Sequence, residues 1–222
     1  IVAALAQRRE RSLMPFTVQS CDNVVNNGDV ARASVVGMAR EWSGADLADW
    51  IQEKGAFPNS MVDRITPAAT RATGEWLEDE HDIIDRWPIA AEPYRQWVIE
   101  DDFALGRPEW EKVGALLTDD VRPYELIKIR LLNAGHSAIA YLGAVAGHEF
   151  IHDVMDDDPI SDFYVALMDR EISPTLPDID GVDLAEYKAT LVERFANPTI
   201  NDQVARVCLD GSSKQPKFTL PI

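Results

Sequence analysis

The sequence predicts an α/β fold that is followed by a mainly helical region. An amphipathic pattern indicates a helix from Ile1 to about Leu13, and residues 16–21 form a β-rich run that ends in Asp22-Asn23. Prolines punctuate residues 57–118, which favours short strands and loops there. Helical periodicity then dominates the second half. We therefore expect a helix-to-strand unit near the start and a helical domain near the end.

The pattern also predicts individual helices. A turn-like run at Asn26-Asn27-Gly28-Asp29 precedes a helix that extends to about Arg40. Further helices are expected at Ala45–Glu53, Pro123–Gly147, Ile160–Glu171 and Leu184–Phe195. The change from mixed to helical patterning near Asp119-Asp120 predicts two domains, residues 1–119 and 120–222.

Composition excludes several classes of protein. The 222 residues are 46% hydrophobic, enough to bury a core, and 21 Lys and Arg against 38 Asp and Glu give a formal net charge of −17. Such a charge repels nucleic acid and anionic membrane surfaces. Cys21 and Cys208 form no disulfide framework or metal-binding pair, and no apolar run reaches the roughly 18 residues of a membrane helix. We expect a cytoplasmic protein with neither nucleic acid nor membrane as a partner.

Three polar residues stand out in the long predicted helix. At about 100° per residue, Lys128, Asn133 and His136 share one broad face, with apolar side chains on the other side. This spacing fits a small-molecule site, but taken alone it favours a solvated face with one hydrogen-bonded histidine. Spacing alone leaves both interpretations open.

The pattern K-x4-N-x2-H at this position resembles the signature of the mannitol dehydrogenase family of polyol-specific long-chain dehydrogenases. Further blocks occur in the family order and extend the resemblance over nearly the whole chain. They are Ser20-Cys21-Asp22-Asn23, Phe57-Pro58-Asn59-Ser60-Met61-Val62-Asp63-Arg64-Ile65-Thr66-Pro67, Glu100-Asp101-Asp102-Phe103, Glu193-Arg194-Phe195-Ala196-Asn197-Pro198 and Asp210-Gly211-Ser212-Ser213-Lys214.

The resemblance implies a mechanism without a catalytic metal. Lys128 matches the lysine that accepts the hydroxyl proton as hydride leaves the same carbon. A free lysine has a pKa near ~10.4, so the site must favour its neutral amine by desolvation or by nearby cationic or donor groups. Asn133 and Asn23 match side chains that stabilise the forming alkoxide, and Asn23 also matches a cofactor contact. Residues that match polyol contacts are His136, Asp63, Arg206 and Lys214.

The resemblance also implies a Rossmann-like dinucleotide domain at 1–119 and a helical substrate-binding domain at 120–222. The cofactor is NAD or NADP, with NAD favoured. The chain contains no GxGxxG turn, so we expect this fingerprint upstream of Ile1 and interpret the chain as an internal segment of a longer enzyme. The loop Val24-Val25-Asn26-Asn27-Gly28 departs from the family's usual run.

The favoured reaction is oxidation of D-mannitol to fructose, and other polyols remain open. One alternative is a hexuronate reductase of the same family. Another is a zinc metallopeptidase, because His148-Glu149-Phe150-Ile151-His152 fits HExxH and Glu171 offers a third ligand. Gly147 interrupts the helix before this motif, so we interpret it as a chance match. A non-catalytic binding module is the third alternative. The sequence does not indicate which oligomeric state the protein has.

Overall fold

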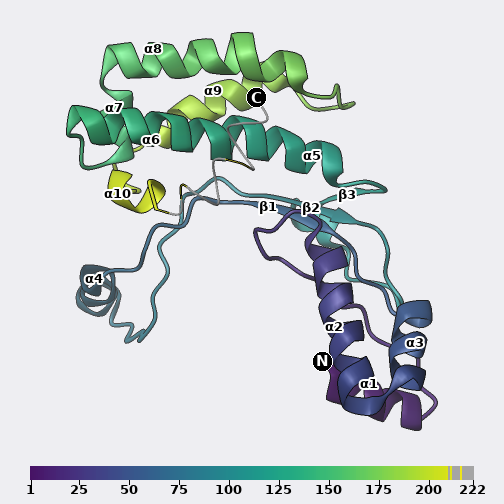
Figure 1. Cartoon of the computed structure of the whole chain (residues 1–222). Helices are drawn as coiled ribbons and strands as arrows, with labels where there is room; N and C mark the ends of the chain where they lie inside the picture. The colour runs from purple at the N-terminus through teal and green to yellow at the C-terminus, as the bar shows by residue number, and fades with distance from the viewer. Residues whose placement is uncertain (210, 212–215, 217–222) are drawn as a thin grey trace. The chain divides into compact units, whose positions relative to one another are not determined.

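The computed structural model describes residues 1–209, 211 and 216, and these divide into two compact units. Unit 1 consists of Ile1–Asp63 and Gln96–Glu125, and unit 2 consists of Arg64–Arg95 and the chain from Leu126 onward (Figure 1). The chain therefore passes between the units after Asp63, after Arg95 and after Glu125. The domain boundary near residue 120 stays a prediction.

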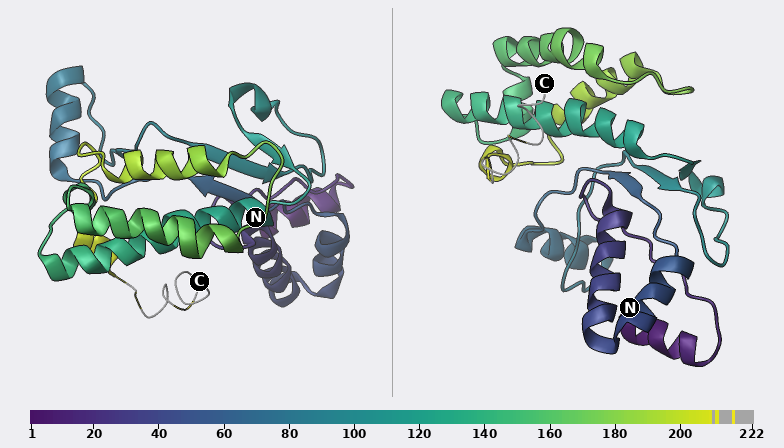
Figure 2. Two further views of the ribbon diagram at one scale, coloured as in Figure 1. Left: turned by 90° about the horizontal axis from the view of Figure 1, so that it is seen from above. Right: turned by 45° about the vertical axis from the view of Figure 1, so that its right-hand side comes forward.

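Three helices form the N-terminal part of unit 1. They are α1 (Val2–Glu10), α2 (Asn27–Ser43) and α3 (Ala45–Lys54), and they pack against one another (Figure 2). Ala39, Ala48 and Ile51 are fully buried between them, with Leu5 and Phe57 beside them. The amphipathic spacing predicted these helices, because small and branched apolar side chains recur on one face of each.

A three-stranded sheet completes unit 1. Its strands are β1 (Ser60–Asp63), β2 (Gln96–Glu100) and β3 (Leu116–Thr118). β1 pairs antiparallel to β2 with Met61 opposite Val98, and β2 pairs parallel to β3 with Val98 opposite Leu116. A 3₁₀-helix, η1 (Trp110–Val113), precedes β3. The prediction of short strands in this region is confirmed. Strand β1 ends at Asp63, which is one of the candidate site residues.

The strand expected at residues 16–21 does not form. The segment has no regular secondary structure, and Val18 N donates a hydrogen bond to the Ala56 carbonyl oxygen at 3.0 Å. A β-rich composition supplies side chains that suit a strand, but a strand also needs a neighbour about 4.8 Å away to complete its ladder. No strand within unit 1 lies beside residues 16–21, so this prediction was wrong.

Unit 2 is helical. Its elements are α4 (Arg71–His81), the π-helical segment η2 (Lys128–Ala134), α6 (Gly135–Ala146), α7 (Ile151–Met155), α8 (Asp158–Leu167), the π-helical segment η3 (Met168–Ile172), the 3₁₀-helix η4 (Ser173–Thr175), α9 (Leu184–Phe195) and α10 (Val204–Val207). Helix α5 (Arg122–Ile127) leads directly into η2. Gly147 ends α6 in a left-handed conformation with φ 89°, as a C-terminal glycine does. The sequence predicted α9 and missed α4, none of whose residues is buried.

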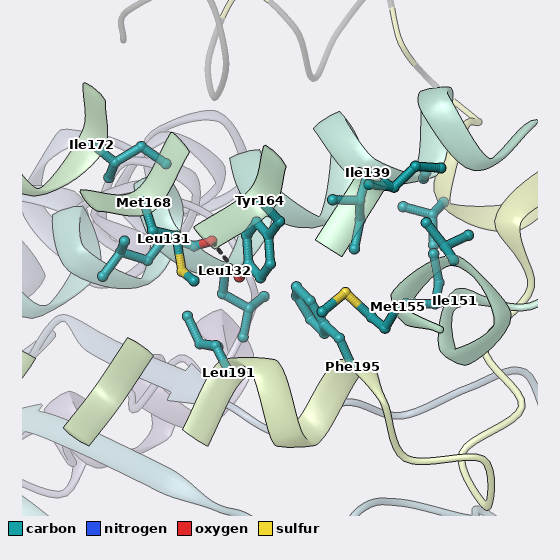
Figure 3. Close-up of a cluster of buried hydrophobic side chains, with 14 of the residues drawn as sticks. Leu131, Leu132, Ile139, Ile151, Met155, Tyr164, Met168, Ile172, Leu191 and Phe195 are labelled. Carbon is teal, nitrogen blue, oxygen red and sulfur yellow. Dashed lines mark hydrogen bonds between the residues drawn. The ribbon is translucent and has the colours of Figure 1, made fainter. Parts of the chain in front are cut away.

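One apolar cluster joins η2, α6, α8 and α9. Leu131, Ile139, Tyr164 and Leu191 are fully buried in it, and Phe195 lies beside Tyr164 (Figure 3). Within the part of the chain that the structure describes, no helix combines the length and apolar character required to cross a bilayer.

Candidate active site

Lys128 and Asn133 lie on the π-helical segment η2, whereas the sequence predicted one continuous α-helix. Hydrogen bonds in a π-helix join residues five apart, so these two residues lie about one turn from each other. On an α-helix the same spacing would turn them well apart. The helical wheel used above was therefore wrong for this segment, and the correction brings the two side chains closer to a common face.

Tyr164 packs directly against the widened part of the helix. The Tyr164 hydroxyl donates to the Leu131 carbonyl oxygen at 3.3 Å, inside η2 (Figure 3). A side chain that bonds a helical carbonyl replaces part of the regular ladder. The Tyr164 ring also lies so close to Gly135 that a Cβ there would stand 2.4 Å from its Cε2 atom. Neither contact can be read from the local sequence of η2.

The two residues differ in how far they are buried. Lys128 is only 6% exposed, and burial disfavours the charged form of an amine. Asn133 is half-buried, and its carbonyl oxygen accepts a hydrogen bond from Ser137 Oγ at 3.0 Å. Main-chain bonding of this kind holds the turn that carries the Asn133 amide.

His136 is the second residue of α6 and is held between a ring and a carboxylate. Its imidazole stacks on Phe195 with ring centroids 4.6 Å apart and an interplanar angle of 21°. Its Nε2 atom lies 3.5 Å from Asp202 Oδ2. These contacts come from α9 and from the segment before α10, so distant parts of unit 2 fix the ring.

Arg206 lies on α10 and binds the same carboxylate. Its Nε donates to Asp202 Oδ1 at 2.7 Å and its Nη2 donates to Asp202 Oδ2 at 2.6 Å. Asp202 is only 4% exposed, whereas the Arg206 side chain is 40% exposed. The structure thus brings two of the predicted polyol-binding residues to one buried aspartate, which the sequence analysis did not select.

A small cavity lies beside this cluster and is lined by Ile65, His136, Ile151, His152, Arg194, Phe195, Asn197, Ile200 and Asp202. Its volume of about 10 Å³ holds at most one water molecule. The cavity is therefore too small for a sugar, and the residues that line it pack around His136.

A buried ion pair anchors residues 64–95 to α9. Arg194 Nε donates to Glu92 Oε2 at 3.0 Å, and Nη2 donates to Oε1 at 2.7 Å. The Arg194 guanidinium also lies 4.0 Å from the centre of the Tyr94 ring. Because Phe195 follows Arg194 directly, this pair fixes the end of α9 that supports His136.

Asn23 and Asp63 belong to unit 1. Asn23 is exposed in the loop before α2, and Asp63 is buried at the end of β1. Asn27 ties the two segments together, because its Nδ2 donates to the carbonyl oxygens of Asp22 and Ser60, each at 2.9 Å. Ser60 N donates back to Asn27 Oδ1 at 2.9 Å. The Asn27 amide therefore holds the Asn23 loop to β1, together with Ser60 Oγ, which donates to the Ser20 carbonyl oxygen at 2.6 Å.

The start of α2 is fixed by close packing as well. A Cβ on Gly28 would lie 2.4 Å from the Phe57 carbonyl oxygen, so only glycine fits there. Asn26 N donates to Glu125 Oε1 at 3.3 Å, and Glu125 is itself buried. The loop that departs from the family's usual run thus has specific contacts of its own. Lys214, the last candidate residue, lies outside the described residues.

The HExxH pattern does not form a helical metal site. His148 follows the end of α6 and its Nε2 lies 2.9 Å from Asp157 Oδ2, whereas His152 lies on α7 with its Nε2 3.4 Å from Asp153 Oδ1. In residues 1–209, 211 and 216 no group of three or more His, Cys, Asp or Glu side chains is arranged to hold a metal ion. The peptidase interpretation therefore lacks the shared helical face that it needs.

Comparison with known families first defines the class. A model of the mannitol dehydrogenase Rossmann domain matches residues 1–112, and a model of the mannitol dehydrogenase C-terminal domain matches residues 120–222. The first part is therefore a portion of a dinucleotide-binding α/β domain, which confirms the predicted fold class. The chain belongs to the mannitol dehydrogenase family.

Its relatives agree with this assignment. The chain is 48% identical to mannitol dehydrogenase 2 of Saccharomyces cerevisiae over 98% of its length, and 48% identical to a mannitol 2-dehydrogenase of Aspergillus oryzae over 100%. It covers 43% and 44% of those proteins, so it spans less than half of their length.

Solved structures show the same similarity. The Pseudomonas fluorescens mannitol 2-dehydrogenase, in a ternary complex with NAD and D-mannitol, is 51% identical with a TM-score of 0.87 over 99% of this chain and 44% of that one. A D-sorbitol dehydrogenase in substrate-free form is 38% identical with a TM-score of 0.92 over 98% of this chain and 45% of that one.

Proposed function

We propose that the full-length protein, meaning the protein that carries this chain at its natural length, is an NAD(P)-dependent polyol dehydrogenase. It would oxidise a polyol such as D-mannitol to the 2-ketose fructose, with NAD favoured over NADP. The observation that carries the proposal is the buried Lys128, about one helical turn from Asn133 on a π-helical segment. The P. fluorescens relative in complex with NAD and D-mannitol supports the choice of substrate and cofactor.

Lys128 acts as general base in this proposal. Its neutral amine accepts the proton of the reacting hydroxyl while the adjacent carbon loses hydride, so a secondary alcohol becomes a ketone and the amine becomes an ammonium. In reduction the ammonium returns the proton to the forming alkoxide. Burial of Lys128 favours the neutral amine that oxidation requires.

Two asparagine amides would stabilise the alkoxide. Asn133 and Asn23 donate hydrogen bonds without titrating, so they serve both directions of the reaction at any working pH. Asn133 is on the same π-helical segment as the base, and Asn23 is exposed in a loop that Asn27 fixes.

Asn23 would also contact the cofactor. A bound nicotinamide dinucleotide supplies the hydride acceptor. The residues of this chain fit the nicotinamide end of such a molecule, because Asn23 offers an exposed amide at the end of the 16–23 segment. The 12 glycines of the chain include no GxGxxG turn, the fingerprint that meets the pyrophosphate in dinucleotide-binding domains.

The polyol hydroxyls would be bound by three charged side chains and by His136, which stacks on Phe195. His136 and Arg206 share Asp202, and Asp63 is a buried carboxylate at the end of β1. Lys214 completes the proposed set from its sequence position. No metal takes part in the proposed reaction. The matched relatives carry polyol dehydrogenase names, which favours a polyol over a hexuronate.

We place this enzyme in the cytoplasm. Two free cysteines and a nicotinamide-dependent reaction suit a reducing compartment.

The test is a substrate survey with the purified full-length protein. Formation of reduced cofactor is followed by absorbance with NAD or NADP, using mannitol, sorbitol, arabinitol and, in the reverse direction, hexuronates. We expect the highest kcat/KM with mannitol and NAD. Failure to reduce either cofactor with any hexitol or pentitol would overturn the proposal, and hexuronate reduction as the fastest reaction would replace it with the alternative.

A further inference from the structure

We propose that Asp202 is a positioning residue that sets the orientation of the polyol-binding side chains His136 and Arg206. This inference rests on the proposed function, because it assigns a task to those two residues. Asp202 matches no block of the family resemblance, and it is one of the few charged residues that are almost completely buried.

The backbone at Asp202 is held by hydrogen bonds on both sides of the next residue. Ile151 N donates to the Asp202 carbonyl oxygen at 2.9 Å, and Val204 N donates to the Glu149 carbonyl oxygen at 2.9 Å. Phe150 and Gln203 form an antiparallel bridge between these two bonds. The aspartate thus stands on a short ladder that joins the start of α7 to the start of α10.

Both carboxylate oxygens of Asp202 bind the Arg206 guanidinium. The two nearly parallel bonds, at 2.7 and 2.6 Å, form the fork-to-fork arrangement that is shorter and stronger than a neutral hydrogen bond. A guanidinium has five N–H groups in one plane. By binding through Nε and Nη2, Asp202 fixes that plane and therefore the direction in which the rest of the fork presents its donors.

Asp202 also faces His136. Its Oδ2 atom lies 3.5 Å from His136 Nε2, while Phe195 stacks against the same ring. The stacking fixes the ring plane, and the carboxylate lies at the Nε2 edge of the ring. His136 and Arg206 are 70 residues apart in sequence, and the shared carboxylate gives their side chains a fixed spacing.

A buried carboxylate is costly unless it is paired, so its burial is itself an argument for a role. The His148 and Asp157 pair provides a contrast, because its Nε2 to Oδ2 distance is 2.9 Å but both side chains are more than 20% exposed. That pair contacts no candidate polyol-binding residue in the described chain. It serves as a matched control for an aspartate that pairs with a histidine.

The test uses Asp202→Asn in the full-length protein, with Asp157→Asn as the control. Asparagine keeps the shape and removes the charge and one acceptor. We expect the KM for mannitol to rise about 10-fold or more, with kcat within about threefold and the KM for NAD unchanged. The control should leave all three constants unchanged. A purely structural loss would instead lower kcat through a smaller active fraction and leave KM as it is.

A double variant tests whether the effect passes through Arg206. If Asp202 acts by orienting Arg206 as well as His136, Asp202→Asn should raise the KM by a smaller factor in the Arg206→Ala background than in the wild type. Multiplication of the two single effects would overturn the proposal, and so would an unchanged KM in Asp202→Asn. Should Asp202→Asn fail to fold, Asp202→Glu keeps the charge but displaces the carboxylate from the Arg206 fork, and it is expected to raise the KM for mannitol in the same way.

A crystal structure of the Asp202→Asn protein separates this inference from the proposed function. The orientation of the Arg206 side chain is visible whether or not the protein oxidises polyols. We expect the guanidinium to leave its wild-type position, and an unchanged position would refute the role of Asp202. A wild-type protein that is inactive with every polyol would refute the proposed function alone.

Discussion

The Tyr164 hydroxyl donates a hydrogen bond to the main-chain carbonyl of Leu131, which lies between Lys128 and Asn133 on the π-helical segment. A core tyrosine on α8 therefore shapes the backbone that carries the proposed base. Burial raises the pKa of the Tyr164 phenol far above its ordinary value, so the hydroxyl stays protonated and continues to donate. The packing of α8 and the chemistry of η2 are consequently linked.

Replacing Tyr164 by Phe should cost stability and activity together. The substitution leaves the buried Leu131 carbonyl without this donor, which is expected to lower the free energy of unfolding by about 1–3 kcal/mol. It should also lower kcat, because the turn that separates Lys128 from Asn133 can then tighten. Denaturant unfolding and steady-state kinetics measure the two effects. Tyr141→Phe is the control, since its hydroxyl donates over 3.4 Å to Cys208 O outside η2. Equal effects in both variants would contradict the link.

Tyr164→Phe should also change how the free energy of unfolding depends on pH in alkaline solution. Above about pH 10 the unfolded chain releases its tyrosine protons, whereas the folded chain keeps the Tyr164 proton because its pKa is raised. The folded state then holds more protons, so the contribution of Tyr164 to stability falls as pH rises. The stability difference between the wild type and Tyr164→Phe should therefore narrow above pH 10. A difference that stays constant with pH would show that the phenol titrates alike in both states.

Gly135→Ala should destabilise unit 2, whereas Gly37→Ala should not. A Cβ at Gly135 would stand 2.4 Å from the Tyr164 ring, and one at Gly37 on α2 would meet no atom within 4 Å. Overpacking of this kind costs about 1–3 kcal/mol. Alanine at an open helical position gains about 0.5–1 kcal/mol over glycine. Thermal unfolding of both variants checks the opposite signs, and equal shifts would show that the ring moves aside freely.

Lys128→Ala should depress both directions of the reaction by about 10²-fold or more, the usual range for a lost acid–base group. In the wild type, oxidation should rise with pH because the base must be neutral, and ketone reduction should fall because it needs the ammonium. The variant should lose this dependence. Lys112→Ala, at an exposed ion pair with Glu109, is the control. Normal activity of Lys128→Ala with an unaltered pH profile would place the base elsewhere.

Asp63→Asn should weaken binding of the polyol substrate. If this buried carboxylate accepts hydrogen bonds from polyol hydroxyls, its loss should raise the KM for mannitol about 10-fold and change the preference among hexitols and pentitols. Cofactor binding should be little affected. Asp49→Asn, which alters an exposed pair with Arg40, is the matched control. Unaltered mannitol kinetics in Asp63→Asn would return this residue to a structural role.

Removal of metals should leave activity intact. His148 and His152 do not lie on one helix, and each of them faces an aspartate, so the two side chains do not form a shared zinc site. We expect full activity after dialysis against a chelator, with elemental analysis of the same sample. One zinc per chain, lost together with activity, would instead favour a metalloenzyme.

The helices could be predicted where local pattern decides them. α2, α3 and α9 bury residues at helical spacing on one face, and Asp183 caps α9 by accepting from Ala185 N and Glu186 N. The prediction of a strand at residues 16–21 was wrong because a strand needs a neighbouring strand to pair with, and composition does not reveal whether one is present. The wide turn of η2 was not predicted, and the Tyr164 side chain that bonds its Leu131 carbonyl is 33 residues away in sequence.

The candidate site was predictable only in part for the same reason. The resemblance selected Lys128, Asn133, His136 and Arg206 by their sequence position. It could not select Asp202 or Asn27, whose importance lies in joining segments that are distant in sequence. The spacing of four residues between Asp202 and Arg206 was the one local signal of a pair. The burial that distinguishes it from an ordinary surface pair is a property of the fold.

The three passages of the chain between the units have a consequence for how such genes can recombine. A single crossover near residue 120 separates Glu92 from Arg194, although the two form one buried pair. A chimaera made there inherits the carboxylate from one parent and the guanidinium from the other, and an unmatched partner leaves a buried charge. Exchange of unit 2 between homologues therefore requires residues 64–95 to travel with the chain from Leu126 onward while residues 96–125 stay behind, which a single crossover cannot achieve.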